Sequence, residues 1–194
     1  MKYSRQSGIS LLEILVTITI FSILSAVAAP SVQELIQKNR ARAIVDEFTS
    51  SLYQARSEAV KRGNRVALCA SDAAQSNCDG SVDSFSGGWI VFTDYNNNQV
   101  LDPVGTLFDT TGDGVNDSPE EILFVSGVPS GSIEIKTNGT PRRFVAYSSN
   151  GLLDGNPLFS FLLNDTSVDK QVARIYMGMT GRARQCVGDD VKCP

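Results

Sequence analysis

An acidic stretch in the middle of the chain has the spacing of a cation-binding loop. Its oxygen-bearing residues occupy positions 1, 3, 5, 9 and 12 of a twelve-residue segment: Asp109, Thr111, Asp113, Asp117 and Glu120. Gly114 occupies position 6, where the loop of an EF-hand uses glycine for its sharp turn. The spacing predicts a structural calcium ion, with Thr at position 3 where Asp or Asn is usual. The alternative is a polar hairpin loop whose Asp, Asn and Gly residues only supply turn conformations.

A second set of residues near the C-terminus could bind phosphate groups. Gly181 is followed by Arg182 and Arg184, two arginines only two residues apart and next to a cysteine. Two guanidinium groups held beside a disulfide loop form a rigid fork for phosphates that needs no contact with bases. Other basic residues could extend this surface: Arg142, Arg143, Lys170, Arg174 and Lys192. The alternative is a glycine turn followed by solvated arginines.

The four cysteines form two close pairs, which suits an oxidising compartment. Eight residues separate Cys69 from Cys78, and six separate Cys186 from Cys193. Pairing within each couple is the simplest of three connectivities, and a disulfide across so short a loop stabilises the fold by about 2–3 kcal/mol. Neither couple has C-x-x-C spacing, so we expect structural disulfides rather than redox chemistry or a metal site.

Several classes of function are excluded by composition. The chain has no histidine, which removes Ser-His-Asp and Cys-His nucleophiles and His-ligated zinc. The net charge of −4 hides an asymmetry, because residues 66–135 contain no Lys or Arg but eleven Asp or Glu. This acidic middle includes a second oxygen-rich run: Asp94, Asn96, Asn98 and Asp102. Glu120 and Glu121 would face opposite sides of a strand, so we expect no enzyme and no cofactor other than the calcium ion.

The N-terminus combines a short basic segment with a long apolar one. Lys2 and Arg5 precede Ile9–Ala29, 21 residues whose only charge is Glu13. A helix of that length is about 30 Å long, enough to cross a membrane with the N-terminus in the cytoplasm. Ala26-Val27-Ala28 would suit an ordinary signal peptidase, but the apolar run is long for a signal peptide and contains a carboxylate. An uncleaved anchor is the remaining alternative.

The segment from Gly8 to Glu13, Gly-Ile-Ser-Leu-Leu-Glu, resembles the processing site of type IV prepilins and type II secretion pseudopilins. The resemblance implies cleavage between Gly8 and Ile9 by a prepilin peptidase of the inner membrane, followed by N-methylation of Ile9. It also implies that Glu13 neutralises the N-terminal amine of a neighbouring subunit in a filament. A buried carboxylate is tolerable where a cation meets it. Ile9 departs from the family's usual Phe or Met.

The remaining sequence predicts an α+β fold. Apolar residues recur at helical spacing up to Arg62, and Gly63 is a natural C-cap, so one helix is expected from Ile9 to about Arg62 with a kink at Pro30. Short apolar runs broken by Gly, Asn, Asp and Pro then predict an antiparallel sheet. The expected strands are 65–70, 88–93, 121–125, 132–137, 143–148, 158–163 and 172–177. The expected parts are therefore a leader (1–8), an apolar helix (9–30), an amphipathic helix (31–63) and a β-rich head (64–194).

Within the head, the stretch from Gly87 to Asp94, Gly-Gly-Trp-Ile-Val-Phe-Thr-Asp, resembles the GspH/FimT branch of minor pilins and pseudopilins. Gly181, Arg182 and Arg184 resemble the G-R-x-R motif with which FimT-type minor pilins bind DNA during natural transformation. The resemblance implies a type IV pilin fold and a minor pilin in or at the tip of a pilus. Its head would be periplasmic and then extracellular, and its partners would be other pilins and double-stranded DNA. The alternative is a minor pseudopilin of a type II secretion system that does not bind DNA.

Overall fold

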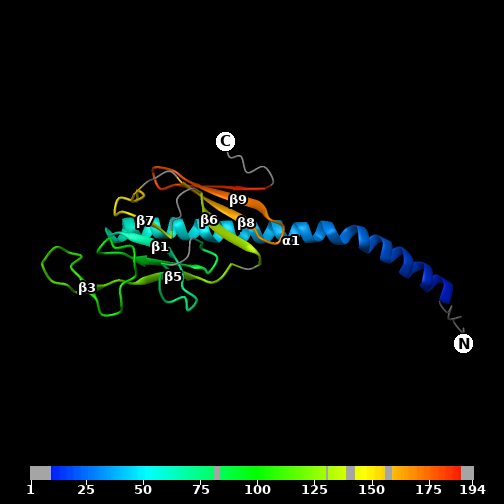
Figure 1. Ribbon diagram of the computed structural model, residues 1–194, viewed down its shortest axis with the longest axis horizontal. Helices are drawn as coiled ribbons and strands as arrows, with labels where there is room; N and C mark the ends of the chain where they lie inside the picture. The colour runs from blue at the N-terminus through cyan, green and yellow to red at the C-terminus, as the bar shows by residue number, and fades with distance from the viewer. Residues whose placement is uncertain (1–9, 81–83, 130, 139–142, 156–158, 189–194) are drawn as a thin grey trace, which may run out of the picture. The chain divides into compact units, whose positions relative to one another are not determined.

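The computed structural model of the 194-residue chain describes residues 10–80, 84–129, 131–138, 143–155 and 159–188 (Figure 1). Residues 1–39 and 40–194 form two separate units. A single helix, α1 (Leu11–Arg62), begins in the first unit and continues through Pro30. Gly63 follows its last turn with a φ of +66°, the left-handed conformation of a glycine C-cap, so the predicted helix and its end are confirmed. Within the described residues, no helix has both the length and the apolar character needed to cross a membrane.

The strands of the second unit form two four-stranded antiparallel sheets and one short hairpin. The first sheet has the order β5 (Ile122–Ser126), β2 (Trp89–Thr93), β1 (Val66–Ala70) and β7 (Phe144–Tyr147). The second has the order β10 (Ala183–Val187), β9 (Lys170–Met177), β8 (Phe159–Asp165) and β6 (Ile133–Thr137). The hairpin pairs β3 (Leu107–Phe108) with β4 (Ser118–Pro119).

One apolar core joins the second half of the helix to both sheets. The rings of Phe85, Trp89 and Phe161 surround Phe48 of α1 edge-on, with ring centroids 4.7–5.4 Å from its own. The indole N–H of Trp89 donates to Ser51 Oγ at 2.9 Å, so the polar atom of this buried ring is satisfied. The core therefore fixes both sheets to the same helix face. All seven predicted strands are present, whereas β3, β4 and β10 were not predicted.

Strands β1 and β2 are buried on both faces. Their second face packs into a smaller core made of Ala67, Cys69, Ile90, Phe92, Leu101 and Ala146. Leu101 belongs to the loop that follows β2, so this loop is held against the sheet by an apolar contact. The second core thus positions the acidic loops of the head.

Candidate functional site

The G-R-x-R segment forms the tight turn between β9 and β10. Gly178 N donates to Arg182 O, and Gly181 N donates to Gly178 O, both at 2.9 Å. Gly181 has a φ of +74°, and a Cβ at this position would lie 2.9 Å from Gly151 O and from the ring of Tyr147. The phenol of Tyr147 also donates to Gly181 O at 3.3 Å. Glycine is therefore required at this position by packing, independently of any ligand.

The two arginines of the motif are exposed on one side of the chain where β10 begins: Arg182 immediately precedes the strand, and Arg184 is its second residue. Between them, Ala183 is buried and pairs with Met177, so Arg182 and Arg184 point away from the core. Within the described part of the chain, neither guanidinium makes a hydrogen bond or an ion pair with another side chain or with backbone. Two unpaired guanidinium groups at a two-residue spacing on an edge strand can bind successive phosphates.

Arg174 and Tyr176 continue this surface onto β9. Tyr176 pairs with Arg184, and Arg174 pairs with Cys186 across the two strands. The Arg174 guanidinium lies 5.4 Å from the centroid of the Tyr176 ring, and its Nη1 donates to the phenol oxygen at 3.0 Å. Arg174 and Arg184 therefore lie on the same face of the β9–β10 pair. We name the set Arg174, Tyr176, Arg182 and Arg184 the arginine surface.

Tyr176 was not singled out from the sequence. The signal was present, because Ala173, Ile175 and Met177 alternate with Arg174 and Tyr176 over residues 173–177. Alternation of this kind places both polar residues on the face opposite the core.

The helix packs against the core face of β10, where Gln185 donates to Asp46 Oδ1 at 3.0 Å, whereas the arginine surface lies on the other face. Tyr53 of α1 donates its hydroxyl to Ala183 O at 2.7 Å, which ties β10 to the helix. Tyr53, Arg56 and Lys61 belong to the lining of an open hollow of about 530 Å³ on this side of the helix. Arg56 was predicted only as part of the solvated helix face. Its contact with the Gly151 turn, on which Gly181 packs, is a tertiary feature that the sequence does not reveal.

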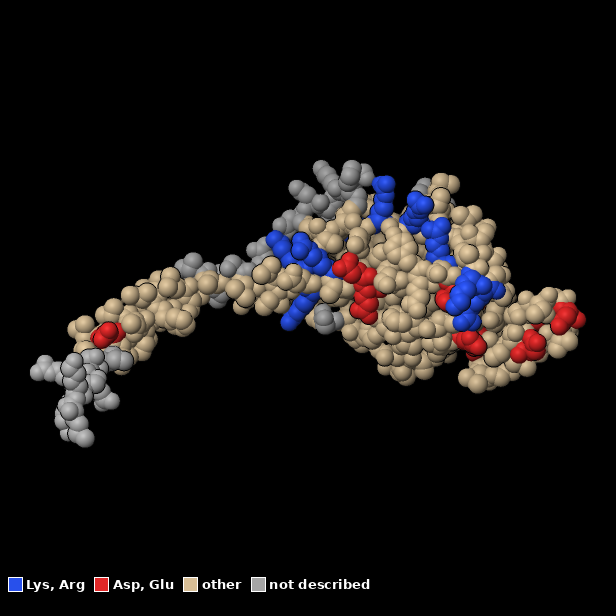
Figure 2. Space-filling view, turned by 180° about the vertical axis from the view of Figure 1, so that it is seen from behind, with Lys and Arg blue, Asp and Glu red and all other residues tan. Residues whose placement is uncertain are grey.

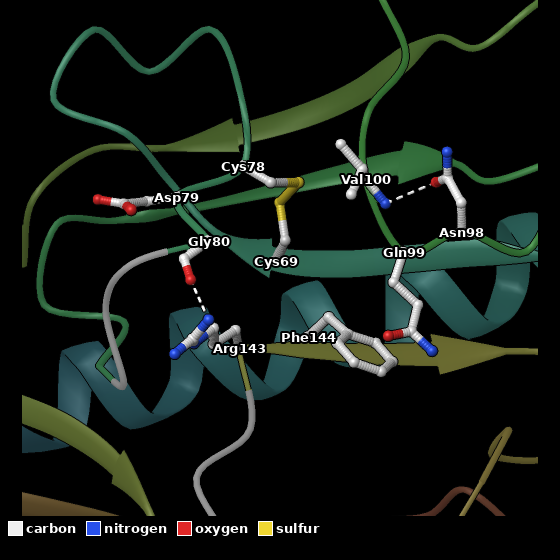
Figure 3. Close-up of a pocket in the computed structure, with 9 residues that line it drawn as sticks. All are labelled: Cys69, Cys78, Asp79, Gly80, Asn98, Gln99, Val100, Arg143 and Phe144. Atoms are coloured by element: carbon white, nitrogen blue, oxygen red, sulfur yellow. Dashed lines mark hydrogen bonds between the residues drawn. A yellow bond between two sulfur atoms is a disulfide. The ribbon is translucent and has the colours of Figure 1, made fainter.

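Arg143, another basic residue of the predicted surface, lies in a different part of the head. Arg143 precedes β7 at the end where Phe144 pairs with Cys69, whereas Tyr147, which contacts Gly181, ends the same strand. Arg143 donates to Gly80 O and lines a pocket of about 390 Å³ beside the Cys69–Cys78 disulfide (Figure 3). The prediction that Arg143 extends the phosphate site is therefore not supported. Arg142 and Lys192 lie outside the described residues.

The predicted disulfides are in part confirmed. Cys69 and Cys78 are bonded, with an S–S distance of 2.05 Å, and they connect β1 to the loop that follows it. Cys186 is also disulfide-bonded. Its expected partner, Cys193, lies outside the described residues.

The loop predicted to bind calcium projects from the head between β3 and β4, and Figure 2 shows acidic side chains gathered on it. Asp109 accepts backbone N–H groups from Gly112 at 2.7 Å and from Gly114 at 2.8 Å. These bonds to Gly114 and Gly112 lower the pKa of Asp109. Its carboxylate thus caps its own turn, the arrangement expected of a polar hairpin loop.

Glu120, the predicted last ligand of that loop, faces elsewhere. Its two oxygens accept the backbone N–H groups of Tyr95 and Asp102, each at 2.9 Å. Burial raises the pKa of Glu120, the two N–H donors oppose this shift, and the negative charges of Asp94 and Asp102 add to it. The structure therefore separates Glu120 from Asp109, Thr111, Asp113 and Asp117, because short strands rather than helices flank the loop. Among the described residues, no three Asp, Glu, His or Cys side chains converge closely enough to hold a metal ion by themselves.

The N-terminal segment is described from Ser10 onward. Gly8 and Ile9, the predicted cleavage site, lie outside the described residues. Glu13 is exposed in the first turn of α1. The hydroxyls of Thr17, Thr19 and Ser22 donate to carbonyl oxygens one turn back, at 2.6–3.0 Å. These polar groups are therefore satisfied inside the helix, which suits an apolar environment.

Comparison with known proteins agrees with this architecture. Residues 45–181 match the family model described as type II transport protein GspH, which is well over half of the chain. The chain belongs to the GspH family. Residues 3–29 also match the prokaryotic N-terminal methylation motif, so the protein is a minor pilin or pseudopilin with that motif. The GspH match ends at Gly181, and Arg182 and Arg184 lie just beyond it.

Solved structures of pilin-like proteins resemble this GspH-family protein in fold. The type IV minor pilin FimU of Pseudomonas aeruginosa matches with a TM-score of 0.53 and 14% identity, over 81% of this chain and 95% of FimU. GspH of E. coli matches with a TM-score of 0.47 and 14% identity, over 81% of this chain and 94% of that one. No functionally curated protein matches the chain. The match to FimU shows that the fold is that of a pilin, with a long N-terminal helix and antiparallel sheets.

Proposed function

We propose that this protein is a minor type IV pilin that binds double-stranded DNA through the arginine surface. The observation that carries the proposal is the pair Arg182 and Arg184, exposed on one side of β10 and unpaired among the described residues. Guanidinium groups without an internal partner are free to form charge-assisted bonds to phosphates. Arg174 and the Tyr176 ring lie on the same face and lengthen the contact.

Electrostatics limits the strength of this binding. The chain has a net charge of −4, and loss of residues 1–8 would remove Lys2 and Arg5 and leave −6. The acidic middle region, residues 66–135, includes the projecting β3–β4 loop. Its negative charge repels a polyanion and so weakens DNA binding. We therefore expect sequence-independent affinity, with a Kd of about 10⁻⁶–10⁻⁴ M at physiological salt.

A titration with duplex DNA tests the proposal. The full chain in an uncharged detergent is compared with Arg182→Ala/Arg184→Ala and with a control, Arg62→Gln/Lys136→Gln. The control removes the same charge, but Arg62 is paired with Glu58 and Glu121, and Lys136 with Glu134. We expect markedly weaker binding in the first variant and binding near the wild-type level in the control. Equal binding by all three proteins would refute the DNA function.

We also propose that the protein is cleaved between Gly8 and Ile9, methylated at Ile9 and held in the inner membrane with its head periplasmic before it joins a pilus. The match to the N-terminal methylation motif supports processing at this segment. Glu13 would then become the fifth residue of the mature chain. Mass spectrometry of the N-terminus from cells with and without prepilin peptidase tests this: an unshortened chain in the presence of the peptidase would contradict it.

The second candidate function is that of a minor pseudopilin in a type II secretion system. It is favoured by the family match itself, whose description names a type II transport protein. In that machine the same helix and core would serve assembly, and the arginine surface would contact another subunit or solvent. Absence of DNA binding by the wild-type chain at low salt would favour this function.

A further inference from the structure

We propose that the loop Asp94–Asp102, together with Glu120, is a calcium-binding site of the head. It differs from the segment 109–120 that the sequence favours, with which it shares only Glu120. Numbered from Asp94, the loop has Asn96 at position 3, Asn98 at position 5, Val100 at position 7 and Asp102 at position 9. In an EF-hand loop these positions ligate calcium, position 7 through its backbone carbonyl.

The backbone of the loop has the turn that such a site requires. Position 6, which is glycine in EF-hand loops, is Gln99, and its φ is +69°. Asn97 also has a positive φ, +67°. A residue other than glycine adopts this conformation at a cost, so the surrounding contacts must hold the loop in place. Leu101 supplies one such contact because it is buried in the second core.

A buried, incompletely satisfied carboxylate points into this loop. Asp94 is fully buried, and its Oδ2 accepts from Arg65 Nη1 at 2.8 Å and from Gln99 N at 3.2 Å. Its Oδ1 has no hydrogen-bond partner among the described residues. The backbone N–H groups of Asn97, Asn98 and Gln99 face this carboxylate, so the Asp94 side chain is directed toward the loop. A buried carboxylate oxygen without a partner is costly unless a ligand meets it.

The other ligands converge on the same loop. The side-chain N–H groups of Asn96 and Asn98 both donate to Asp102 Oδ2, at 2.6 and 3.0 Å. Figure 3 shows Asn98 Oδ1 accepting from Val100 N, at 2.8 Å. Glu120 binds the backbone N–H groups at both ends of the loop, those of Tyr95 and Asp102. Glu120 thus takes the place of the glutamate that an EF-hand provides at position 12, supplied here by the segment after β4.

The charge and composition of the set fit a calcium ion. Asp94, Asp102 and Glu120 carry three negative charges, and Arg65, which also pairs with Asp154, is the cation bound to this group in the described structure. Two carboxamides and one backbone carbonyl bring the oxygen-bearing groups to six, and calcium takes six to eight oxygen ligands. The carboxylates alone do not form a metal-binding group, so the two amides must turn their oxygens toward the ion. Asp102 and Glu120 also line an open pocket of about 400 Å³, so an ion can reach these two carboxylates from solvent.

Calorimetric titration with CaCl₂ tests the site in the full chain, after chelator treatment and in an uncharged detergent. We expect one ion per chain with a Kd of about 10⁻⁵–10⁻³ M, and weaker binding of Mg²⁺, which demands stricter geometry. Asp102→Asn/Glu120→Gln should weaken calcium binding about tenfold or more, because two ligand charges are lost. The matched control, Asp113→Asn/Asp117→Asn, removes the same charge from the β3–β4 loop and should leave the affinity unchanged. Absence of calcium binding by the wild type, or equal loss in both variants, would overturn the proposal.

A second measurement does not depend on the folding of any variant. In amide NMR spectra of the wild-type chain, calcium should shift the resonances of Tyr95, Gln99 and Asp102, whose N–H groups bind the site carboxylates. Shifts confined to residues 109–117 would place the ion in the other loop and overturn the proposal. The site does not depend on DNA binding, so failure of the DNA titration leaves it unaffected.

Discussion

The two four-stranded sheets share one core, but the arginines beside β1 and those beside β10 differ in whether an acidic side chain compensates their charge. At the sheet β5-β2-β1-β7, Arg65 is buried between Asp94 and Asp154, and Arg62 is paired with Glu58 and Glu121. At the sheet β10-β9-β8-β6, Arg182 and Arg184 are exposed and unpaired within the described residues. An arginine therefore indicates a binding surface only where no acidic side chain of the fold compensates its charge. Arg62 and Arg65 stabilise the fold, whereas Arg182 and Arg184 are available to a binding partner.

The largest effect on stability is expected at Arg65. Arg65→Leu leaves Asp94 as a buried charge without its cation, and the free energy of unfolding should fall by about 3–5 kcal/mol. Urea denaturation in the presence of a chelator measures this loss. Arg62→Leu is the control, because the Arg62 pairs are partly exposed and contribute about 1 kcal/mol or less. Similar losses in both variants would remove the distinction between buried and surface pairs.

A smaller loss is expected at Gly181. Gly181→Ala forces a side chain into the left-handed region and within 2.9 Å of Gly151 O, which should lower the free energy of unfolding by about 1–3 kcal/mol. Gly178→Ala in the same turn is the matched control, since its Cβ would make only an ordinary contact, 3.5 Å from Arg182 O. Thermal denaturation compares the two. If Gly181→Ala is as stable as Gly178→Ala, then packing does not explain the glycine of the motif.

The smallest effect on stability is expected at the arginines themselves. Arg182→Ala/Arg184→Ala should change the free energy of unfolding by less than about 0.5 kcal/mol, because neither guanidinium has a described partner to lose. The same urea titration measures it. A loss above about 1 kcal/mol would show that the two arginines stabilise the fold, and it would contradict the proposed difference between the arginines of the two sheets.

The sequence predicts the helix because its apolar residues recur at helical spacing, and the seven strands because each is a short apolar run bounded by turn residues. Strand β10 escapes prediction because, of its first three residues, only Ala183 is buried and the other two are exposed polar residues. The strand is instead held by its backbone pairing with β9 and by the hydrogen bond from the Tyr53 hydroxyl to Ala183 O. Strands β3 and β4 are two residues long, too short for any period to be visible.

Some of the proposed binding residues can be predicted from local sequence spacing, and others only from tertiary contacts. The spacing of Gly181, Arg182 and Arg184 is local, so the motif and its exposure follow from the sequence. Oxygen-rich spacing occurs in both acidic loops, and the sequence does not show which of them Glu120 meets. That choice depends on the hydrogen bonds of Glu120 to Tyr95 and Asp102 and on the burial of Asp94, both tertiary.

The salt dependence of DNA binding tests most directly the claim that the unpaired arginines bind phosphates. Each phosphate contact contributes about 0.9 to the slope of log Kobs against log salt concentration. We predict that Arg182→Ala/Arg184→Ala makes the slope shallower by about 2, whereas the paired-cation control, Arg62→Gln/Lys136→Gln, leaves it unchanged. An equal slope in the wild type and in the arginine variant would contradict the claim that Arg182 and Arg184 bind phosphates.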